Sequence, residues 1–285
     1  MAIHDQDYVR YDGPLRESGA WWVIAWTGFR TYLGFGRTKL TLIVLWLVNP
    51  LFFLGLVFLE YVLRGQMGQM GDLDAPAASY ITGYLQVEAF SLAVLFMARG
   101  CGVISEDLRY RTFQLYFSKP ISRADYAVGK FGSLFLLGSL VTVLPSLIVG
   151  GLRLAFFFQT DFFKGLLAQV GIGVALSIFI TIVFCGIVAG LSSTTERTGY
   201  VVLSWIGVLL VPFILQGIVY IATSGADMAS LWSLTGELKV FSDMLLLDDF
   251  AFEGPAWLAP SILIVAGGAG IAAMIRRISS LEGVA

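Results

Sequence analysis

Charged side chains are scarce in this sequence: Asp, Glu, Lys and Arg together make up 13% of its 285 residues. A soluble domain carries about 25% charged residues, and these supply much of the polar surface that covers its core. Here 57% of the residues are hydrophobic and the mean hydropathy is +0.81, so too few polar side chains remain for that task. The scarcity excludes an ordinary soluble domain and predicts a protein that lies in a lipid bilayer.

Cysteine and histidine are also rare, which excludes several kinds of site. Cys101 and Cys185 lie far apart in apolar sequence without CxxC or Cys/His spacing, so we expect buried thiols and neither a disulfide nor a metal-ligand pair. His4 is the single histidine and stands in a polar N-terminal segment. We therefore expect no histidine-based metal site or catalytic site in this chain.

Nucleotide-binding and catalytic motifs are missing as well. The phosphate-binding loop G-x-x-x-x-G-K-[ST] requires an upstream glycine and a Ser or Thr after the lysine, and Gly129–Lys130 has neither. The sequence also contains no HExxH zinc helix and no G-x-S-x-G nucleophile elbow. We expect a non-catalytic chain that binds no metal, no cofactor and no nucleic acid.

Long apolar runs are the dominant feature that is present. A helix needs about 20 apolar residues to cross the hydrocarbon core, and a strand of a membrane barrel needs about ten in alternation. Six stretches are long enough for helices and too continuously apolar for barrel strands. We therefore predict an all-α membrane protein with six transmembrane helices, at residues 40–63, 80–104, 126–150, 165–191, 200–223 and 257–274.

The positions of Lys and Arg predict the orientation, because these residues concentrate in cytoplasmic segments. With the N-terminus inside, 14 of the 18 fall in inner segments and four fall outside, at Arg64, Arg153, Lys164 and Lys239. We therefore predict a multi-pass protein of the cytoplasmic (inner) membrane with both termini cytoplasmic. Its parts are an N-terminal segment (1–39), a membrane domain (40–275) with an acidic outer loop (224–256), and a C-terminal tail (276–285).

The segment before the first span, residues 18–40, mixes aromatic side chains with cations. Trp21, Trp22 and Trp26 precede Arg30. Aromatic rings favour the headgroup layer of a membrane, and cations favour its anionic phosphates. We predict an amphipathic interfacial helix along the inner leaflet; the alternative is a solvated N-terminal helix.

Residues 105–130 read SEDLRYRTFQLYFSKPISRADYAVGK and form the largest inner loop. Ser105 is a suitable N-cap, and the acidic side chains of Glu106 and Asp107 suit the first turn of a helix. Pro120 ends that helix. Two apolar stripes run along its opposite faces. One consists of Tyr110, Phe113 and Phe117 and the other of Leu108, Thr112 and Leu115, and the flanks carry Arg109 and Arg111.

The second apolar stripe indicates a second binding partner, since one stripe is enough to rest on the bundle or the lipid. The alternative is a membrane-surface helix whose cations only satisfy the orientation rule. After the proline, Ser122 and Asp125 have the spacing of a capping box that would start the third span.

The stretch GVISEDLRYRTFQLYFSKPISRADYAVGK resembles the loop after the second span in permease subunits of ABC-2-type ATP-binding-cassette transporters. That loop commonly reads Ile-Ser-x-Glu, then Gly-Thr followed by Ser-x-Pro-Ile-Ser-Arg, then Gly-Lys. Arg111 stands where the family usually has glycine. The matching positions are Ile104, Ser105, Glu106, Thr112, Leu115, Ser118, Pro120, Ile121, Ser122, Arg123, Tyr126, Gly129 and Lys130.

The resemblance implies an ABC-2 (type V exporter-like) permease fold with a cytoplasmic coupling helix in loop 105–125. This helix would dock into a separate ATPase subunit, which holds the ATP and Mg. The coupling residues so implied are Glu106, Asp107, Leu108, Arg109, Tyr110, Arg111, Thr112, Phe113, Leu115 and Phe117.

The resemblance also implies further partners: membrane lipid around the chain and other proteins. A second permease copy, in a homodimer or a heterodimer, would meet this one through the first and fifth spans, near Trp205, Phe213 and Gln216. The outer loop would fold into short helices at the outer mouth, where an extracytoplasmic protein could bind.

Two acidic side chains fall inside predicted spans, Glu60 near the outer end of the first and Glu88 about a third of the way into the second. Charged groups in hydrocarbon usually face a bundle interior or a water-filled path. Together with Asn49, beside the helix-bending Pro50, they are candidates for a translocation path.

Three functions are open at this point. The first is a permease subunit that couples ATP hydrolysis on a partner chain to substrate translocation, with export expected from the family. The second is a non-transport component that transmits ATPase-driven movement to an extracytoplasmic partner. The third is an intramembrane enzyme that uses Glu88.

Overall fold

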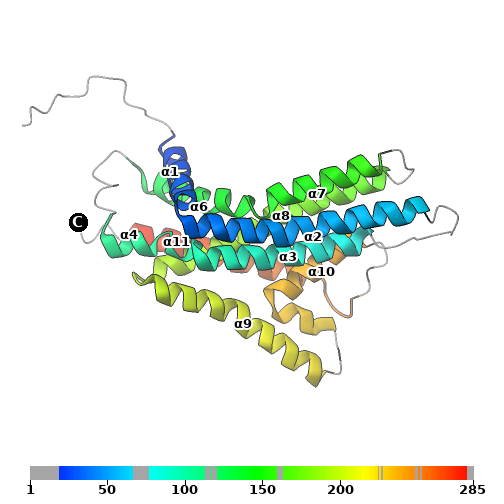
Figure 1. Ribbon diagram of the computed structural model, residues 1–285. Coiled ribbons are helices and arrows are strands. Elements are labelled where there is room, and N and C mark those ends of the chain that lie inside the picture. The colour runs from blue at the N-terminus through cyan, green and yellow to red at the C-terminus, as the bar shows by residue number, and fades with distance from the viewer. Residues whose placement is uncertain are drawn as a thin grey trace, which may run out of the picture.

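The computed structural model describes residues 19–66, 77–112, 116, 121–158, 163–223, 225, 227–247, 250 and 252–280. These residues form helices and turns, and no strand occurs among them. Most of the long helices run side by side in one bundle (Figure 1). The α-helices are α1 (Ala20–Gly34), α2 (Gly36–Gln66), α3 (Ala77–Ala98), α4 (Ser105–Tyr110), α6 (Arg123–Ser139), α7 (Val143–Phe156), α8 (Phe163–Thr194), α9 (Thr198–Ala222), α10 (Leu234–Leu246) and α11 (Leu258–Ser280), with 3₁₀ turns η1 (Gly100–Gly102) and η2 (Asp227–Trp232).

The prediction of six transmembrane helices is confirmed. Six segments of the described chain are long and apolar enough to cross a membrane, and each overlaps a predicted stretch. They are Thr38–Phe58, Tyr80–Ala98, Arg123–Phe156, Phe163–Thr194, Thr198–Ala222 and Leu258–Ser280.

The third span is broken between α6 and α7, so the uninterrupted helix predicted over 126–150 is wrong. Residues 140–142 form turns between the two helices. The hydroxyl of Thr142 shares a 2.6 Å hydrogen bond with that of Thr181 on α8. Pro145 lies in the first turn of α7, where its missing N–H would have no helical acceptor. The proline therefore suits the start of a second helix.

The centre of the bundle is α8, which packs against α3, α6, α7 and α11. Its contact with α11 depends on glycine. A Cβ atom at Gly186 would lie 2.5 Å from the carbonyl oxygen of Gly267, and one at Gly190 would lie 2.6 Å from Cα of Gly270. Small residues permit this close approach of two backbones, as is common between helices in membranes.

α9 diverges from the other helices along its length (Figure 1). Its first half is anchored by Trp205, which is fully buried, donates a 3.0 Å hydrogen bond to the carbonyl of Ala93 and lies edge-on to Phe184. Most of the remaining apolar side chains of α9 are exposed, so this helix lacks a partner along much of its surface within the single chain.

α1 lies across one end of the bundle, packs mainly on α6 and turns at Phe35 into α2 (Figure 1). A helix separate from the first span is therefore present where it was predicted. Its place in the headgroup layer stays a prediction. The short helices predicted for the outer loop are also present, as η2 and α10.

Candidate coupling site

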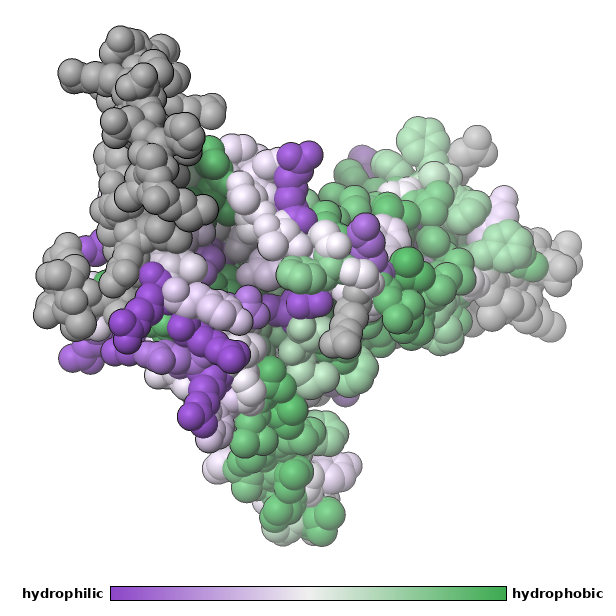
Figure 2. All heavy atoms as spheres, turned by 60° about the vertical axis from the view of Figure 1, so that its left-hand side comes forward, coloured by the Kyte–Doolittle hydropathy of each residue, from purple (hydrophilic) through white to green (hydrophobic). Residues whose placement is uncertain are grey.

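α4 lies at the same end of the bundle as α1 and the last turns of α11 (Figure 1). Figure 2 turns this end towards the viewer and shows hydrophilic side chains gathered there, while hydrophobic side chains cover the flanks and the α9 arm. The end that carries α4 is therefore the polar end of an otherwise apolar molecule.

The start of α4 is held by α8. The backbone N–H groups of Ile104 and Ser105 both donate to Oγ of Ser192 at 3.0 Å, and this hydroxyl donates to the carbonyl of Cys101 at 2.8 Å. Oγ of Ser105 donates to the same carbonyl and lies 3.1 Å from Oγ1 of Thr198, at the start of α9. The prediction that Ser105 caps the helix is wrong, because Ser105 is its first helical residue and a hydroxyl from α8 acts as the acceptor.

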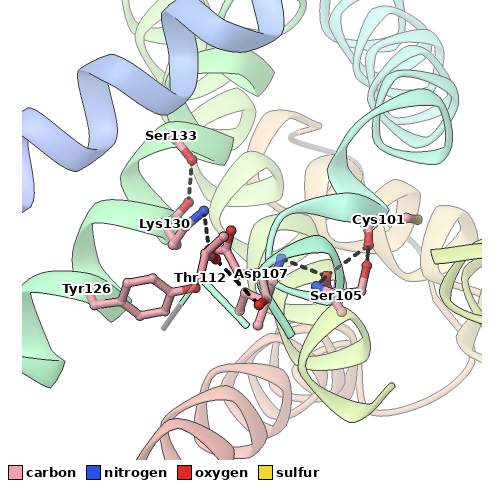
Figure 3. Close-up of polar contacts among 9 residues, drawn as sticks. Cys101, Ser105, Asp107, Thr112, Tyr126, Lys130 and Ser133 are labelled. Carbon is pink, nitrogen blue, oxygen red and sulfur yellow. Dashed lines mark hydrogen bonds and ion pairs between the residues drawn. The ribbon is translucent and has the colours of Figure 1, made fainter. Parts of the chain in front are cut away.

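The middle of α4 is tied to α6 through Asp107, as Figure 3 shows. Nζ of Lys130 lies 2.5 Å from Oδ2 of Asp107, and the hydroxyl of Tyr126 donates to the same oxygen at 2.6 Å. Both charged side chains are only 14% exposed. Charge-assisted hydrogen bonds that are shielded in this way are stronger than those between exposed groups. This cluster is a second attachment of α4, after the one to α8 and α9.

This cluster was not predicted from the sequence. Tyr126 and Lys130 both belong to the family-like motif, and their spacing of four places them on one face of α6. That shared face could have indicated that the two side chains contact the same partner.

α4 ends earlier than predicted. Arg111 has φ 54 and ψ 31, in the left-handed region, and its N–H bonds back to the carbonyl of Leu108. The N–H of Thr112 bonds to the carbonyl of Asp107, so the two bonds form a Schellman motif. A single helix running to Pro120 is therefore wrong. The family-typical glycine at this position suits such a conformation, because glycine carries no Cβ penalty there.

The exposed face of α4 carries charge and one aromatic ring. Glu106, Arg109, Tyr110 and Arg111 are exposed, and the guanidinium of Arg109 lies over the ring of Tyr110. Leu108, on the opposite side, is buried in the core. The structure thus places one apolar side chain of α4 inward and Tyr110 outward. The predicted coupling residues Phe113, Leu115 and Phe117 lie outside the described residues.

Two of the three candidates for a translocation path are buried inside the single chain. Glu88 is fully buried inside the single chain, where Ser146 of α7 and Ser177 of α8 donate hydrogen bonds to it. Asn49 is also fully buried. Glu60 belongs to α2, but its side chain lies outside the described part of the chain.

The three residues predicted near a dimer axis differ in exposure. Trp205 is fully buried, so its assignment to an interface with a second copy is wrong: its indole is used inside the subunit. Phe213 is 59% exposed and stays a candidate. Gln216 accepts a hydrogen bond from Ser233 and is half-buried.

Within the described ranges, no three or more His, Cys, Asp and Glu side chains group in a way that could hold a metal ion. The polar end presents charged side chains and an aromatic ring, from Glu106, Arg109, Tyr110 and Arg111.

The chain matches the model of the family described as "ABC-2 family transporter protein" over residues 23–242, from α1 to α10. No curated protein matches the chain.

Proposed function

Because the chain belongs to the ABC-2 family of transporter proteins and spans the membrane, we propose that it is the permease subunit of an exporter whose separate ATPase docks on α4. The ATPase supplies ATP and Mg, and this chain supplies the path through the bilayer. α4, the polar end and both termini then face the cytoplasm of the inner membrane, in agreement with the 14 of 18 cationic residues in the inner segments.

One observation carries this proposal: α4 has one exposed face and three attachments. The exposed face presents Arg109 and Tyr110, a cation and an aromatic ring of the kind enriched in protein interfaces. The opposite face is bonded to α6 through Asp107, to α8 through Ser192 and to α9 through Thr198. A push on α4 by a partner would therefore reach three spans at once.

We further propose that a second permease copy covers α9. Apolar side chains on this helix are strongly exposed in the single chain, among them Leu203, Leu210, Phe213, Ile214, Ile218 and Ile221. Movement of α4 would act directly on the first turn of α9, and so on the contact between the two copies. That arrangement joins ATP-driven movement to opening of a path between subunits.

The test is a charge reversal on the exposed face of α4. Arg109→Glu with Arg111→Glu should abolish co-purification of the ATPase from native membranes and lower ATP turnover of the remaining complex at least tenfold. Stability should change little, because exposed charges away from packed features contribute little to it. The matched control is Arg276→Glu with Arg277→Glu, a pair of exposed arginines at the same end of the molecule. Equal ATPase recovery from both double variants would contradict docking on α4.

A further inference from the structure

Buried polar side chains gather where the third span is broken. Both carboxylate oxygens of Glu88 accept 2.6 Å hydrogen bonds, Oε1 from Ser146 and Oε2 from Ser177. The two serine hydroxyls lie 2.7 Å apart. All three side chains are at most 6% exposed. The carboxylate thus lies in a closed environment formed by three spanning helices.

This cluster has more polar groups than its hydrogen bonds use. The hydroxyl of Tyr84, on a residue 5% exposed, lies close to Glu88 and Ser146 without a hydrogen bond of good geometry to either. The side-chain amide of Asn49 is fully buried, and neither its oxygen nor its nitrogen has a partner. A buried polar group without a partner costs about 1–3 kcal/mol, so these groups indicate a place for a further hydrogen-bonding species.

The register of α2 places Asn49 at the level of Glu88. One turn before Asn49, Leu45 packs with Leu95 and Val141. One turn after it, Phe53 packs with Tyr84 and Val149. Asn49 lies midway between these two contacts. On α3, Glu88 lies between the contact residues Tyr84 and Leu95. On the side of α7, Ser146 lies between the contact residues Val141 and Val149.

A cavity of about 30 Å³ leads from this cluster along α7. It is lined at one end by Tyr84 and Ser146 and at the other by Tyr80 and Arg153. Ser146 and Arg153 are seven residues apart, which is about 10 Å along a helix. A volume of about 30 Å³ is enough for one or two water molecules, but the walls of this cavity are mostly apolar, and the polar groups that can hold water are at its two ends. Water at the inner end would contact the Glu88 cluster through Tyr84 and Ser146.

The surroundings favour a proton over a metal cation as the species that neutralises Glu88. No Lys, Arg or His of the described chain forms an ion pair with it. A metal cation such as Ca²⁺ takes about six or more oxygen ligands, whereas a proton needs one oxygen and can move along water and hydroxyl groups. Further inward, the hydroxyl of Thr181 donates to the backbone carbonyl of Ser177 and shares a hydrogen bond with the hydroxyl of Thr142. The elements around Glu88 carry further titratable and charged groups. These are Tyr80 and Tyr84 on α3, Arg153 on α7, Cys185 on α8, Glu237, Lys239 and Asp243 on α10, and otherwise residues in the first half of α6 and at the ends of α2 and α8.

We propose that Glu88, held by Ser146 and Ser177 and flanked by Tyr84 and Asn49, is an intramembrane proton-binding site supplied through the cavity beside Arg153. The proton binds a carboxylate oxygen, and one hydroxyl turns its hydrogen bond to accept from the acid. Neutralisation in this way lets the carboxyl group stay in hydrocarbon, where an unpaired charge is costly. This site does not depend on the coupling role of α4.

The experiment is an infrared pH titration of the full chain in lipid nanodiscs, from about pH 5 to about pH 9. The readout is the C=O stretching band of carboxylic acids, compared between wild type, Glu88→Gln and the matched control Glu237→Gln. Glu237 is a second buried carboxyl group, outside the spans. The expected result is an acid band that decreases as the pH rises and that contains one component from each carboxyl group: Glu88→Gln removes one component, and Glu237→Gln removes a different one and leaves the first.

Further arms keep the result decisive. Ser177→Ala should keep the band and move its frequency and its titration midpoint, since one hydrogen bond to the carboxyl group is lost; this variant also serves if Glu88→Gln does not fold. Sodium chloride should have the same effect as choline chloride. An acid band unchanged by Glu88→Gln would overturn the proposal, as would a band unmoved in Ser177→Ala. Selective loss of the band in sodium at constant pH would assign the site to a metal cation instead.

Discussion

The attachment of α4 to α6 predicts a measurable coupling between Asp107 and Lys130. Asp107→Asn keeps the shape of the side chain and an acceptor for Tyr126 but removes the charge. Lys130→Met keeps most of the apolar stem and removes the ammonium group. Each single change should destabilise the chain, because each leaves one charged group partly buried without its counter-ion.

The size of the effect follows from the exposure of the pair. Exposed ion pairs contribute up to about 1 kcal/mol, and breaking a fully buried pair costs about 3–5 kcal/mol. At 14% exposure for both side chains and a separation of 2.5 Å, the loss should be about 2 kcal/mol for either single variant. About 1 kcal/mol shifts Tm by about 2–4 °C in a chain of this size, so we expect Tm to fall by about 4–8 °C.

The assay is thermal unfolding of the chain in nanodiscs over a double-mutant cycle. The double variant Asp107→Asn with Lys130→Met should be at least as stable as the less stable of the two single variants. This corresponds to an interaction energy of about 1–2 kcal/mol between the two side chains. Glu106→Gln, at an exposed neighbouring position, is the control and should leave Tm within about 1 °C of wild type. Strictly additive losses in the cycle would refute the attachment of α4 to α6 through this pair.

Two further predictions concern other positions. Arg111→Gly should stabilise the chain by about 1 kcal/mol, because it removes the Cβ penalty of the left-handed conformation, and a lower Tm for this variant would contradict the Schellman ending of α4. Burial raises the pKa of Glu237 from 4.5 to about 8, and its Oε2 has no hydrogen-bond partner. The unfolded chain therefore loses this proton at lower pH than the folded chain, and Tm of the wild type should fall as the pH rises from about 4.5 to about 8 relative to that of Glu237→Gln. Parallel Tm curves for the two proteins would show that Glu237 does not titrate in this way.

Much of the fold was predictable because its signals are local. The six spans follow from apolar length, and the capping box at Ser122 and Asp125 forms as predicted, with the N–H of Asp125 donating to Oγ of Ser122 at 3.0 Å. Both patterns concern residues close together in the chain. Neither pattern depends on a tertiary contact.

The parts that failed depend on contacts between distant residues. The cap of α4 comes from Ser192, which is 87 positions away from Ser105. Trp205 is buried because it donates to the carbonyl of Ala93 and packs edge-on to Phe184, although the family resemblance implied a contact with a second permease copy. The early end of α4 depends on Arg111 adopting a conformation that side chains rarely adopt, and no sequence periodicity reports that.

The candidate site was predicted in outline and corrected in detail. Glu106, Arg109, Tyr110 and Arg111 are exposed and Leu108 is buried, so the described part of α4 presents charge and one member of a predicted apolar stripe. The attachments that would make this face useful to a partner, through Asp107 and Lys130, were not predicted because their spacing of 23 residues fits no helical period.

The central claim is that the exposed face of α4 contacts an ATPase. The most direct measurement is in-cell photo-crosslinking with a benzophenone amino acid in place of Tyr110, which is 68% exposed. Phe158, 67% exposed beyond the far end of α7, is the matched position for comparison. The account predicts an adduct between the Tyr110 position and a phosphate-loop ATPase, and none from the Phe158 position. Adducts with lipid alone at Tyr110, or equal ATPase adducts from both positions, would contradict it.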